Sequence, residues 1–442
     1  MSRSATDLRD LRHELAGALR QARDRTLALV TPLDDDELHD QPIDFLSPLV
    51  WDVGHIACIE ELWLVRELTG RPSSDPARDE LYDAFENPRW VRGELPLLPR
   101  QEALTYLADV REEALRVLRD TELAHDAPLL AEGRVHRMIA QHESQHQETM
   151  LQALALRRGG HYLPDQEAPP PLLRPVDDTD RVEIPGGPVT IGTDDTRWTY
   201  DNERPAHRVE VAGFALDRFP VTARRYAAFI ADGGYVRPEL WSERGWEWRQ
   251  EAGHEAPQGW EPAADRGWRR RRFGQLEPVD PREPVQHVSY LEAEAFARWA
   301  GGRLPTEIEW EKAAGWDPVR RRSRRFPWGD TAPTPERANV GMRRFGPQPV
   351  GSFPAGASAY GVEQLAGDVY EWTGSPFTGY PGFLAFPYRG YSEVFFGGDY
   401  RVLRGASWAV PAPFTRVTYR NWDRPYRRQI FAGLRVAYDL PR

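Results

Sequence analysis

The N-terminal third of the chain places apolar residues at three- and four-residue spacing, the pattern of amphipathic helices. Three segments show this pattern: 5–32, 100–121 and 132–158. A fourth begins at Ser47-Pro48, where a serine can cap a helix with proline at its first position, and runs to about Leu68. Four such helices predict an antiparallel four-helix bundle.

A proline-rich stretch follows the last of these helices. Its prolines are Pro164, Pro169, Pro170, Pro171 and Pro175, and they predict an inter-domain linker over 164–178. Beyond it the helical period is lost, and Trp, Gly and Pro interrupt short segments. We therefore expect a bundle domain over 1–163 and an irregular α+β domain over 179–442.

Local signals place a few elements in the second domain. Residues 182–192 predict a β-hairpin. The pairs Ser289/Glu292 and Thr306/Glu309 are capping boxes, which predict helices over 291–299 and 307–314. The remaining sequence predicts loops and short strands, and loops of this length inside a compact domain usually build a site.

Charge and cysteine content exclude several classes of protein. A net charge of −11 argues against a nucleic-acid-binding surface. The single cysteine, Cys58, excludes an internal disulfide and a Cys-x-x-Cys site. The N-terminus has no apolar signal region, and no run reaches the roughly 18 apolar residues of a membrane span. We expect a cytoplasmic protein with no nucleic-acid or membrane partner.

Two histidines on the last bundle helix are candidate metal ligands. His142 and His146 are four residues apart, so both imidazoles project from one face, which is the apolar one. One cation would satisfy both, although two hydrogen-bonded structural histidines are the alternative. On the second helix, His55 shares a face with Trp51 and Cys58, so it also points inward. We therefore expect one metal held by His55, His142 and His146.

The same letters also spell His-Glu-x-x-His, the zinc metalloprotease signature. The extended form of that motif needs a glycine and a histidine where this chain has Thr149 and Gln152. The other form needs a glutamate from a following helix, but here a short Arg-Gly segment leads into proline-rich sequence. A zinc metalloprotease is therefore the less favoured alternative.

Five motifs of the second domain resemble the formylglycine-generating-enzyme fold, a C-type-lectin-like α+β domain. They are Asp201–His207, Leu304–Glu311, Phe326–Gly329, Gly367–Thr373 and Leu403–Trp408. The bundle with its three histidines resembles a DinB-type bundle. Together, over nearly the whole chain, the two domains resemble the ergothioneine-biosynthesis sulfoxide synthases of the actinobacterial type.

This resemblance implies a mononuclear non-haem Fe(II) held by His55, His142 and His146. It also implies that the enzyme joins the sulfur of γ-glutamylcysteine to C2 of the imidazole of hercynine (Nα-trimethylhistidine). O₂ is the oxidant and the product is a sulfoxide. Three neutral imidazoles suit Fe(II) and leave coordination positions open. Spacing alone does not separate iron from zinc.

The resemblance also implies roles for residues that bind the substrates. Gln145 matches a position that contacts the hercynine imidazole, and Asn421 and Trp422 match positions around its trimethylammonium group, where an aromatic face suits a cation. Four positions match those that bind the thiol substrate: Arg89, Arg92, Asp423 and Arg427. Guanidinium groups suit the two carboxylates of a γ-glutamyl dipeptide.

A tyrosine completes the site implied by the resemblance. Tyr388 matches a catalytic tyrosine whose phenol delivers a proton and favours C–S bond formation over oxidation of the thiol to a sulfinate. Tyr391 matches its neighbour in the substrate site, and Tyr380 lies close by in the sequence. Because these residues and the iron ligands come from different domains, we expect neither domain to work alone.

Other interpretations remain. Formylglycine-generating enzymes use a cysteine pair in their domain, whereas the one cysteine here, Cys58, lies in the bundle. A non-catalytic binding module would not need the three histidines. An ovothiol-type synthase, which joins cysteine to histidine, is the nearest alternative in chemistry. A calcium ion near Asp368 and Glu371, as in related domains, is a further expectation.

Overall fold

A computed structural model describes the chain over residues 5–123, 127–157, 159–160, 162, 166–171, 175–264 and 267–441. The chain divides into two compact units. Unit 1 consists of Met1–Gly160 with Asp195–Trp198, and unit 2 consists of His161–Asp194 with Thr199–Arg442. Within the described residues, no helix is long and apolar enough to cross a membrane.

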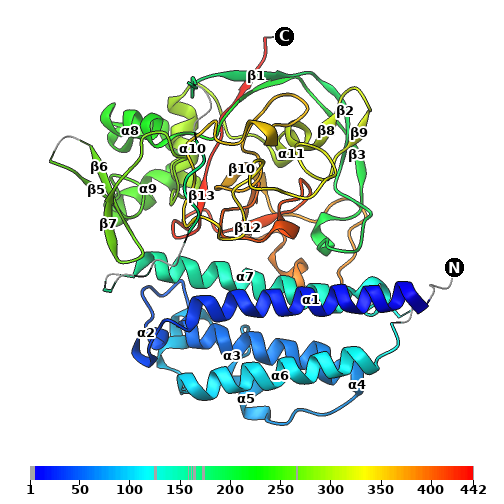
Figure 1. Ribbon diagram of the computed structural model, residues 1–442. Helices are drawn as coiled ribbons and strands as arrows, with labels where there is room; N and C mark the ends of the chain where they lie inside the picture. Colours follow the sequence, from blue (N-terminus) through cyan, green and yellow to red (C-terminus); the bar gives the residue numbers. More distant parts are fainter. Residues whose placement is uncertain are drawn as a thin grey trace. The chain divides into compact units, whose positions relative to one another are not determined.

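Four long helices lie side by side in unit 1 (Figure 1). They are α1 (Ala5–Val30), α3 (Leu49–Glu60), α6 (Arg100–Asp120) and α7 (Arg134–Leu156). Helix α1 packs along α7, and α3 packs against both α6 and α7. The predicted four-helix bundle is confirmed.

The second bundle helix differs in detail from the prediction. After α3 the chain continues without a break through a π-helical segment, η1 (Glu61–Arg66), into α4 (Glu67–Thr69). The predicted serine cap is wrong, because Pro48 is the capping residue and no side chain caps the helix. Ser47 Oγ instead accepts a hydrogen bond from Arg92 Nη1 at 2.8 Å. The shorter elements of unit 1 are α2 (Asp35–His39), α5 (Pro76–Leu81), η2 (Arg89–Glu94) and η3 (Ala131–Gly133).

A buried ionic cluster joins the four long helices, because each contributes one member. Arg23 Nε contacts Glu143 Oε1 at 2.8 Å and Arg23 Nη2 contacts Glu60 Oε2 at 2.6 Å. Arg111 bridges the same two carboxylates, with Nη2 at 2.7 Å from Glu143 Oε2. Burial opposes the ionisation of Glu143, but Arg23 and Arg111 outweigh it and hold its pKa below the usual range. Two cations and two anions therefore balance inside the bundle.

Unit 2 is built from short strands in small sheets, together with short helices and long loops. The strands are β1 (Arg181–Ile184), β2 (Gly187–Ile191), β3 (His207–Val211), β4 (Phe214–Asp217), β5 (Trp260–Pro262), β6 (Trp268–Arg272), β7 (Gln275–Pro278), β8 (Trp316–Asp317), β9 (Arg322–Ser323), β10 (Tyr370–Pro376), β11 (Arg401–Arg404), β12 (Asn421–Asp423), β13 (Ala432–Gly433) and β14 (Ala437–Asp439). Their orders are β1-β4-β14, β12-β11-β10-β13, β2-β3, β5-β6-β7 and β8-β9. The α+β class is confirmed.

The helices of unit 2 are α8 (Ala223–Ala231), α9 (Glu243–Ala252), α10 (Tyr290–Trp299) and α11 (Glu307–Gly315). Single 3₁₀ turns are η4 (Asp201–Glu203), η5 (Gly234–Val236), η6 (Pro238–Leu240), η7 (Pro354–Gly356), η8 (Arg389–Tyr391), η9 (Glu393–Phe395) and η10 (Ala412–Phe414). Both predicted capping boxes are present, at the N-termini of α10 and α11.

The predicted hairpin over 182–192 is wrong. Strands β1 and β2 are both present, but β1 pairs with β4 and β2 pairs with β3. One antiparallel register continues through both pairs, from Arg181 opposite Asp217 to Ile191 opposite His207. The stretch is thus one bent strand, and at the bend a Cβ on Gly186 would lie 3.0 Å from the backbone nitrogen of Gly213. Glycine is needed there because the two strands approach so closely.

The described part of the proline-rich stretch belongs to unit 2 and packs against other segments of it. Glu167 N donates to Arg343 O at 2.9 Å, Arg344 Nε donates to Ala168 O at 2.9 Å, and Phe345 N donates to Gln166 Oε1 at 3.1 Å. Parts of the predicted linker, residues 164–165 and 172–174, lie outside the described residues.

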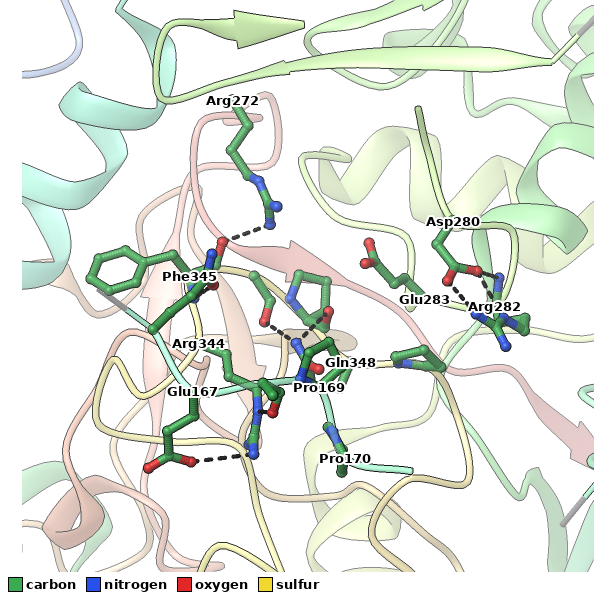
Figure 2. A pocket seen from close by; sticks show the side chains of 15 residues that line it. Glu167, Pro169, Pro170, Arg272, Asp280, Arg282, Glu283, Arg344, Phe345 and Gln348 are labelled. Carbon is green, nitrogen blue, oxygen red and sulfur yellow. Dashed lines mark hydrogen bonds and ion pairs between the residues drawn. The ribbon is translucent and has the colours of Figure 1, made fainter. Parts of the chain in front are cut away.

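A cavity of about 530 Å³ lies beside this stretch, and Figure 2 shows the side chains that line it. The described residues that line it carry three guanidinium groups and three carboxylates: Arg272, Arg282, Arg344, Glu167, Asp280 and Glu283. Arg344 pairs with Glu167 at 3.2 Å, and Arg282 pairs with Asp280 at 2.7 Å. Because the charges balance, the lining favours neither an anion nor a cation.

Several motifs of the second domain form buried ion pairs. Arg435 pairs with Glu371 at 2.8 Å, and Arg420 pairs with Glu307 at 2.8 Å. Two further pairs are Arg404 with Glu311 and Arg416 with Glu203. All four arginines are almost completely buried. These pairs connect segments far apart in the sequence, so they hold the long loops in place relative to one another.

Candidate metal centre

Three histidines converge inside the bundle. His55 comes from α3, and His142 and His146 come from successive turns of α7. One ring nitrogen of each lies within 4.8 Å of the others, and the ring centroids are 4.6–5.1 Å apart. Helical spacing places two of the imidazoles on one face, and the packing of α3 on α7 brings the third to meet them.

Hydrogen bonds orient two of the three rings. His55 Nδ1 lies 2.7 Å from the backbone oxygen of Tyr82, and His146 Nδ1 lies 2.8 Å from Asp52 Oδ1. Each acceptor requires a proton on Nδ1, so Nε2 keeps its lone pair for a metal. The donor set therefore fits a cation that prefers imidazole, such as Fe(II) or Zn²⁺.

Packing around His55 is tight. Its ring stacks on Trp51 with centroids 4.7 Å apart and an interplanar angle of 14°. The guanidinium of Arg92 covers Trp51, 3.4 Å from a ring centroid. A Cβ on Gly54 would lie 2.1 Å from the Tyr82 ring, so a larger residue would displace the segment whose carbonyl holds His55.

Burial keeps the imidazoles of His55 and His142 neutral. It lowers the pKa of His55 well below its usual range, and the charges of His146, Arg92 and Arg89 act in the same direction. Burial likewise lowers the pKa of His142, with His146 and His55 contributing. Neutral imidazole is the form that binds a metal.

The glutamate of the His-Glu-x-x-His pattern does not serve this centre. Glu143 is fully buried in the ionic cluster with Arg23 and Arg111, and it also accepts a hydrogen bond from Thr26 Oγ1 at 2.8 Å. A metalloprotease needs this carboxylate as a general base beside the metal. The contacts of Glu143 argue against that alternative.

The two arginines expected to bind the thiol substrate differ in their contacts. Arg89 Nη1 donates to Phe45 O at 3.0 Å, the one hydrogen bond of its guanidinium to a described residue. Arg92 is only 4% exposed, and it donates to Asn87 O at 2.8 Å as well as to Ser47 Oγ. Burial lowers the pKa of Arg92 to about 9, and the charge of Arg89 acts in the same direction. Arg92 can thus reach a substrate carboxylate only by giving up an intrachain contact.

The other predicted substrate residue of unit 1, Gln145, is half-buried on α7 directly before His146.

In unit 2, the tyrosines near η8 are not equivalent. Tyr388 is 39% exposed and its ring meets Tyr391 edge-on, with centroids 6.0 Å apart. Tyr391 stacks on Tyr200 at 5.3 Å. Tyr380 is buried beneath the guanidinium of Arg420, 4.2 Å from its ring centroid. Of the three, Tyr388 is the most accessible to a substrate.

The predicted substrate residues of β12 are half-buried. Trp422 stacks on Phe377, with centroids 4.2 Å apart and an interplanar angle of 8°. Asn421 Oδ1 accepts from the backbone nitrogen of Trp422 at 2.9 Å. Asp423 Oδ1 lies 3.6 Å from Arg427 Nε. Stacking therefore holds the indole of Trp422 in one orientation.

The two carboxylates expected near a calcium ion accept bonds from protein donors. Asp368 accepts from the side chains of Asn339 and Gln364 and from Gln348 N, each at 2.9 Å. Glu371 pairs with Arg435 and accepts from Trp310 Nε1 at 2.7 Å. Both carboxylates thus have partners within the described part of the protein.

Sequence reasoning missed the acceptors behind the histidines. Asp52 stands three residues before His55 on α3 and is buried, which is unusual for an aspartate unless it has a partner. An aspartate on the same helix face as a candidate ligand, one turn before it, is a signal that the sequence contains. The carbonyl of Tyr82 gives no such signal, because every residue has a carbonyl.

Comparisons with known proteins cover nearly the whole chain. Residues 18–150 match the DinB superfamily, and residues 145–440 match the Sulfatase-modifying factor enzyme 1-like domain. A Hercynine oxygenase from Mycolicibacterium smegmatis is 51% identical over 439 residues, which is 97% of this chain and 99% of that protein. The Hercynine oxygenase of Mycobacterium tuberculosis is 51% identical over 433 residues, covering 97% and 99%. A Formylglycine-generating enzyme from Thermomonospora curvata is 35% identical over 222 residues, covering 43% and 69%. The chain therefore belongs to the hercynine oxygenase family.

Proposed function

We propose that this chain is an iron-dependent sulfoxide synthase that acts on hercynine and γ-glutamylcysteine. The thiol sulfur bonds to imidazole C2, the C2–H and S–H bonds break, and O₂ supplies the sulfoxide oxygen while its other oxygen leaves as water. Atoms and electrons balance without another reductant. The observation that carries the proposal is the three-histidine centre inside a chain that matches hercynine oxygenases over 97% of its length.

In this proposal His55, His142 and His146 hold Fe(II), which supplies activation of O₂ and leaves coordination positions open. Gln145, Asn421 and Trp422 bind hercynine, and the indole held by Phe377 offers its face to the trimethylammonium group. The thiol substrate is bound by the charged residues Arg89, Arg92, Asp423 and Arg427. Tyr391 supports substrate binding, and the hydroxyl of Tyr388 delivers a proton during oxidation.

Product analysis tests the reaction and separates it from the ovothiol-type alternative. The protein is loaded anaerobically with Fe(II) and given hercynine or histidine, each with γ-glutamylcysteine or cysteine, before O₂ is admitted. Mass spectrometry should find the sulfoxide mainly from hercynine with γ-glutamylcysteine. A product mainly from histidine with cysteine would instead establish the ovothiol-type reaction.

Arg89→Ala should weaken binding of γ-glutamylcysteine and leave hercynine unaffected. Loss of one charge-assisted carboxylate contact costs roughly 1.5–3 kcal/mol, so KM for the dipeptide should rise about 10- to 100-fold. Steady-state kinetics with each substrate varied in turn measures this split. Arg71→Ala is the matched control, because Arg71 is exposed and pairs with Glu113 on the bundle surface. Equal rises in both KM values would contradict the role of Arg89.

Tyr388→Phe should change the product rather than binding. Without the phenolic proton, formation of the sulfoxide should slow by roughly 100-fold or more, and O₂ should oxidise the thiol to its sulfinate. The ratio of sulfoxide to sulfinate, measured together with O₂ consumption, reports the change. Tyr391→Phe should be milder and mainly affect KM. A wild-type product ratio for Tyr388→Phe would move the catalytic role to Tyr391 or Tyr380.

A further inference from the structure

We propose that Asp52 is a positioning residue that holds His146 ready for the metal before the metal arrives. This inference rests on the proposed function, because it concerns the same three-histidine centre. It adds a fourth side chain to that centre and a specific task for it.

The contacts of Asp52 point to His146. Asp52 Oδ1 lies 2.8 Å from His146 Nδ1, and the aspartate is 1% exposed. Its other oxygen, Oδ2, is also buried and has no hydrogen-bond partner among the described residues. A buried carboxylate is costly unless its partners compensate. The histidine is therefore the main partner that the described part of the chain offers Asp52.

The position of Asp52 links the two ligand-bearing helices. Asp52 is one turn before His55 on α3, while His146 is on α7. One helix thus carries both a metal ligand and the group that orients a ligand on the other helix. The bond joins two side chains of the protein and so restrains the orientation of the His146 ring.

The chemistry of the acceptor determines what Asp52 does. A carboxylate accepts but does not donate, so His146 must carry its proton on Nδ1 and present the lone pair of Nε2. The negative charge also makes that nitrogen a stronger donor to a cation. His55 has only a neutral carbonyl behind it, the Tyr82 oxygen. His146 should therefore be the more firmly held of the two supported ligands.

Cobalt binding tests this inference without catalysis. Co(II) is titrated into the metal-free full-length protein and followed by its visible absorption. Asp52→Asn keeps the shape but allows an amide N–H to face Nδ1, which would favour the tautomer with a proton on Nε2. The Kd for Co(II) should rise about 10- to 100-fold. The control Asp109→Asn, at an exposed site on α6, should bind as the wild type does.

A double-mutant cycle separates positioning from general support of the fold. If Asp52 acts through His146, Asp52→Asn should add little loss of Co(II) affinity in a His146→Ala background. Asp52→Asn binding within twofold of wild type, or losses that add fully in the double mutant, would overturn the inference. Failure of the wild type itself to bind Co(II) would instead count against the proposed metal centre.

Discussion

Replacing His55 with alanine is expected to abolish metal loading and formation of the sulfoxide. The remaining pair, His142 and His146, comes from one helix, so the centre would lose its only ligand from α3. The loss of affinity should exceed the roughly 10- to 100-fold that removal of an outer hydrogen-bond partner costs. Metal content after reconstitution with Fe(II), measured by elemental analysis, and product yield are the readouts.

A surface histidine provides the control for this experiment. His13 is exposed on α1, so His13→Ala should retain metal and turnover. His55→Ala is also expected to remain folded, because the bundle keeps its ionic cluster, and circular dichroism should show this. Normal iron content and turnover in His55→Ala would refute the three-histidine centre.

Among the substitutions proposed for this protein, Glu143→Gln is expected to lower the free energy of unfolding the most. Arg23 and Arg111 would then share one buried carboxylate, Glu60, and an uncompensated positive charge would remain inside the bundle. Removing one partner of a buried ion pair costs about 3–5 kcal/mol. Urea unfolding, followed by fluorescence, should show the loss in the free energy of unfolding of unit 1.

The same variant distinguishes a structural glutamate from a catalytic one. Protein that remains folded should still bind the metal and make product, because Glu143 faces the arginines. Glu14→Gln is the control: the Glu14 side chain is 53% exposed and pairs with the buried Arg137, so the change should cost less than the loss of the fully buried Glu143. Unchanged stability combined with lost turnover would support the metalloprotease-like role of Glu143.

Helical periodicity in the sequence is the reason that much of unit 1 could be predicted. It gave the four long helices and the inward register of His55, His142 and His146, because residues four apart share a face. The same arithmetic turns Glu143 about 100° around the helix from His142, but a glutamate in this position is the general base of metalloproteases, so only its arginine partners remove it from the centre. The helical period contains no information on π-helical η1 or on the carbonyl behind His55.

Unit 2 was less accessible to prediction because its structure depends on long-range pairing. The segment 182–192 has the local features of a hairpin, yet its partner is 207–217, and local sequence does not report a distant partner. Capping boxes at α10 and α11 were found because their donors and acceptors lie within four residues. Roles for Tyr388, Asn421 and Trp422 came only from motif resemblance.

The buried arginine–glutamate pairs of unit 2 explain why its motifs identify an architecture better than a reaction. Glu203, Glu307, Glu311 and Glu371 all belong to the motifs that reveal the fold, and each has an arginine for a partner. Replacing one member of a pair would leave the other charge buried without its partner, so the two positions can change only together. Exposed loops can vary independently. Proteins that share this scaffold can therefore retain the same recognisable residues while their reactions diverge. The reaction must be inferred from the exposed loops and from any further domain, which in this chain is the helical bundle.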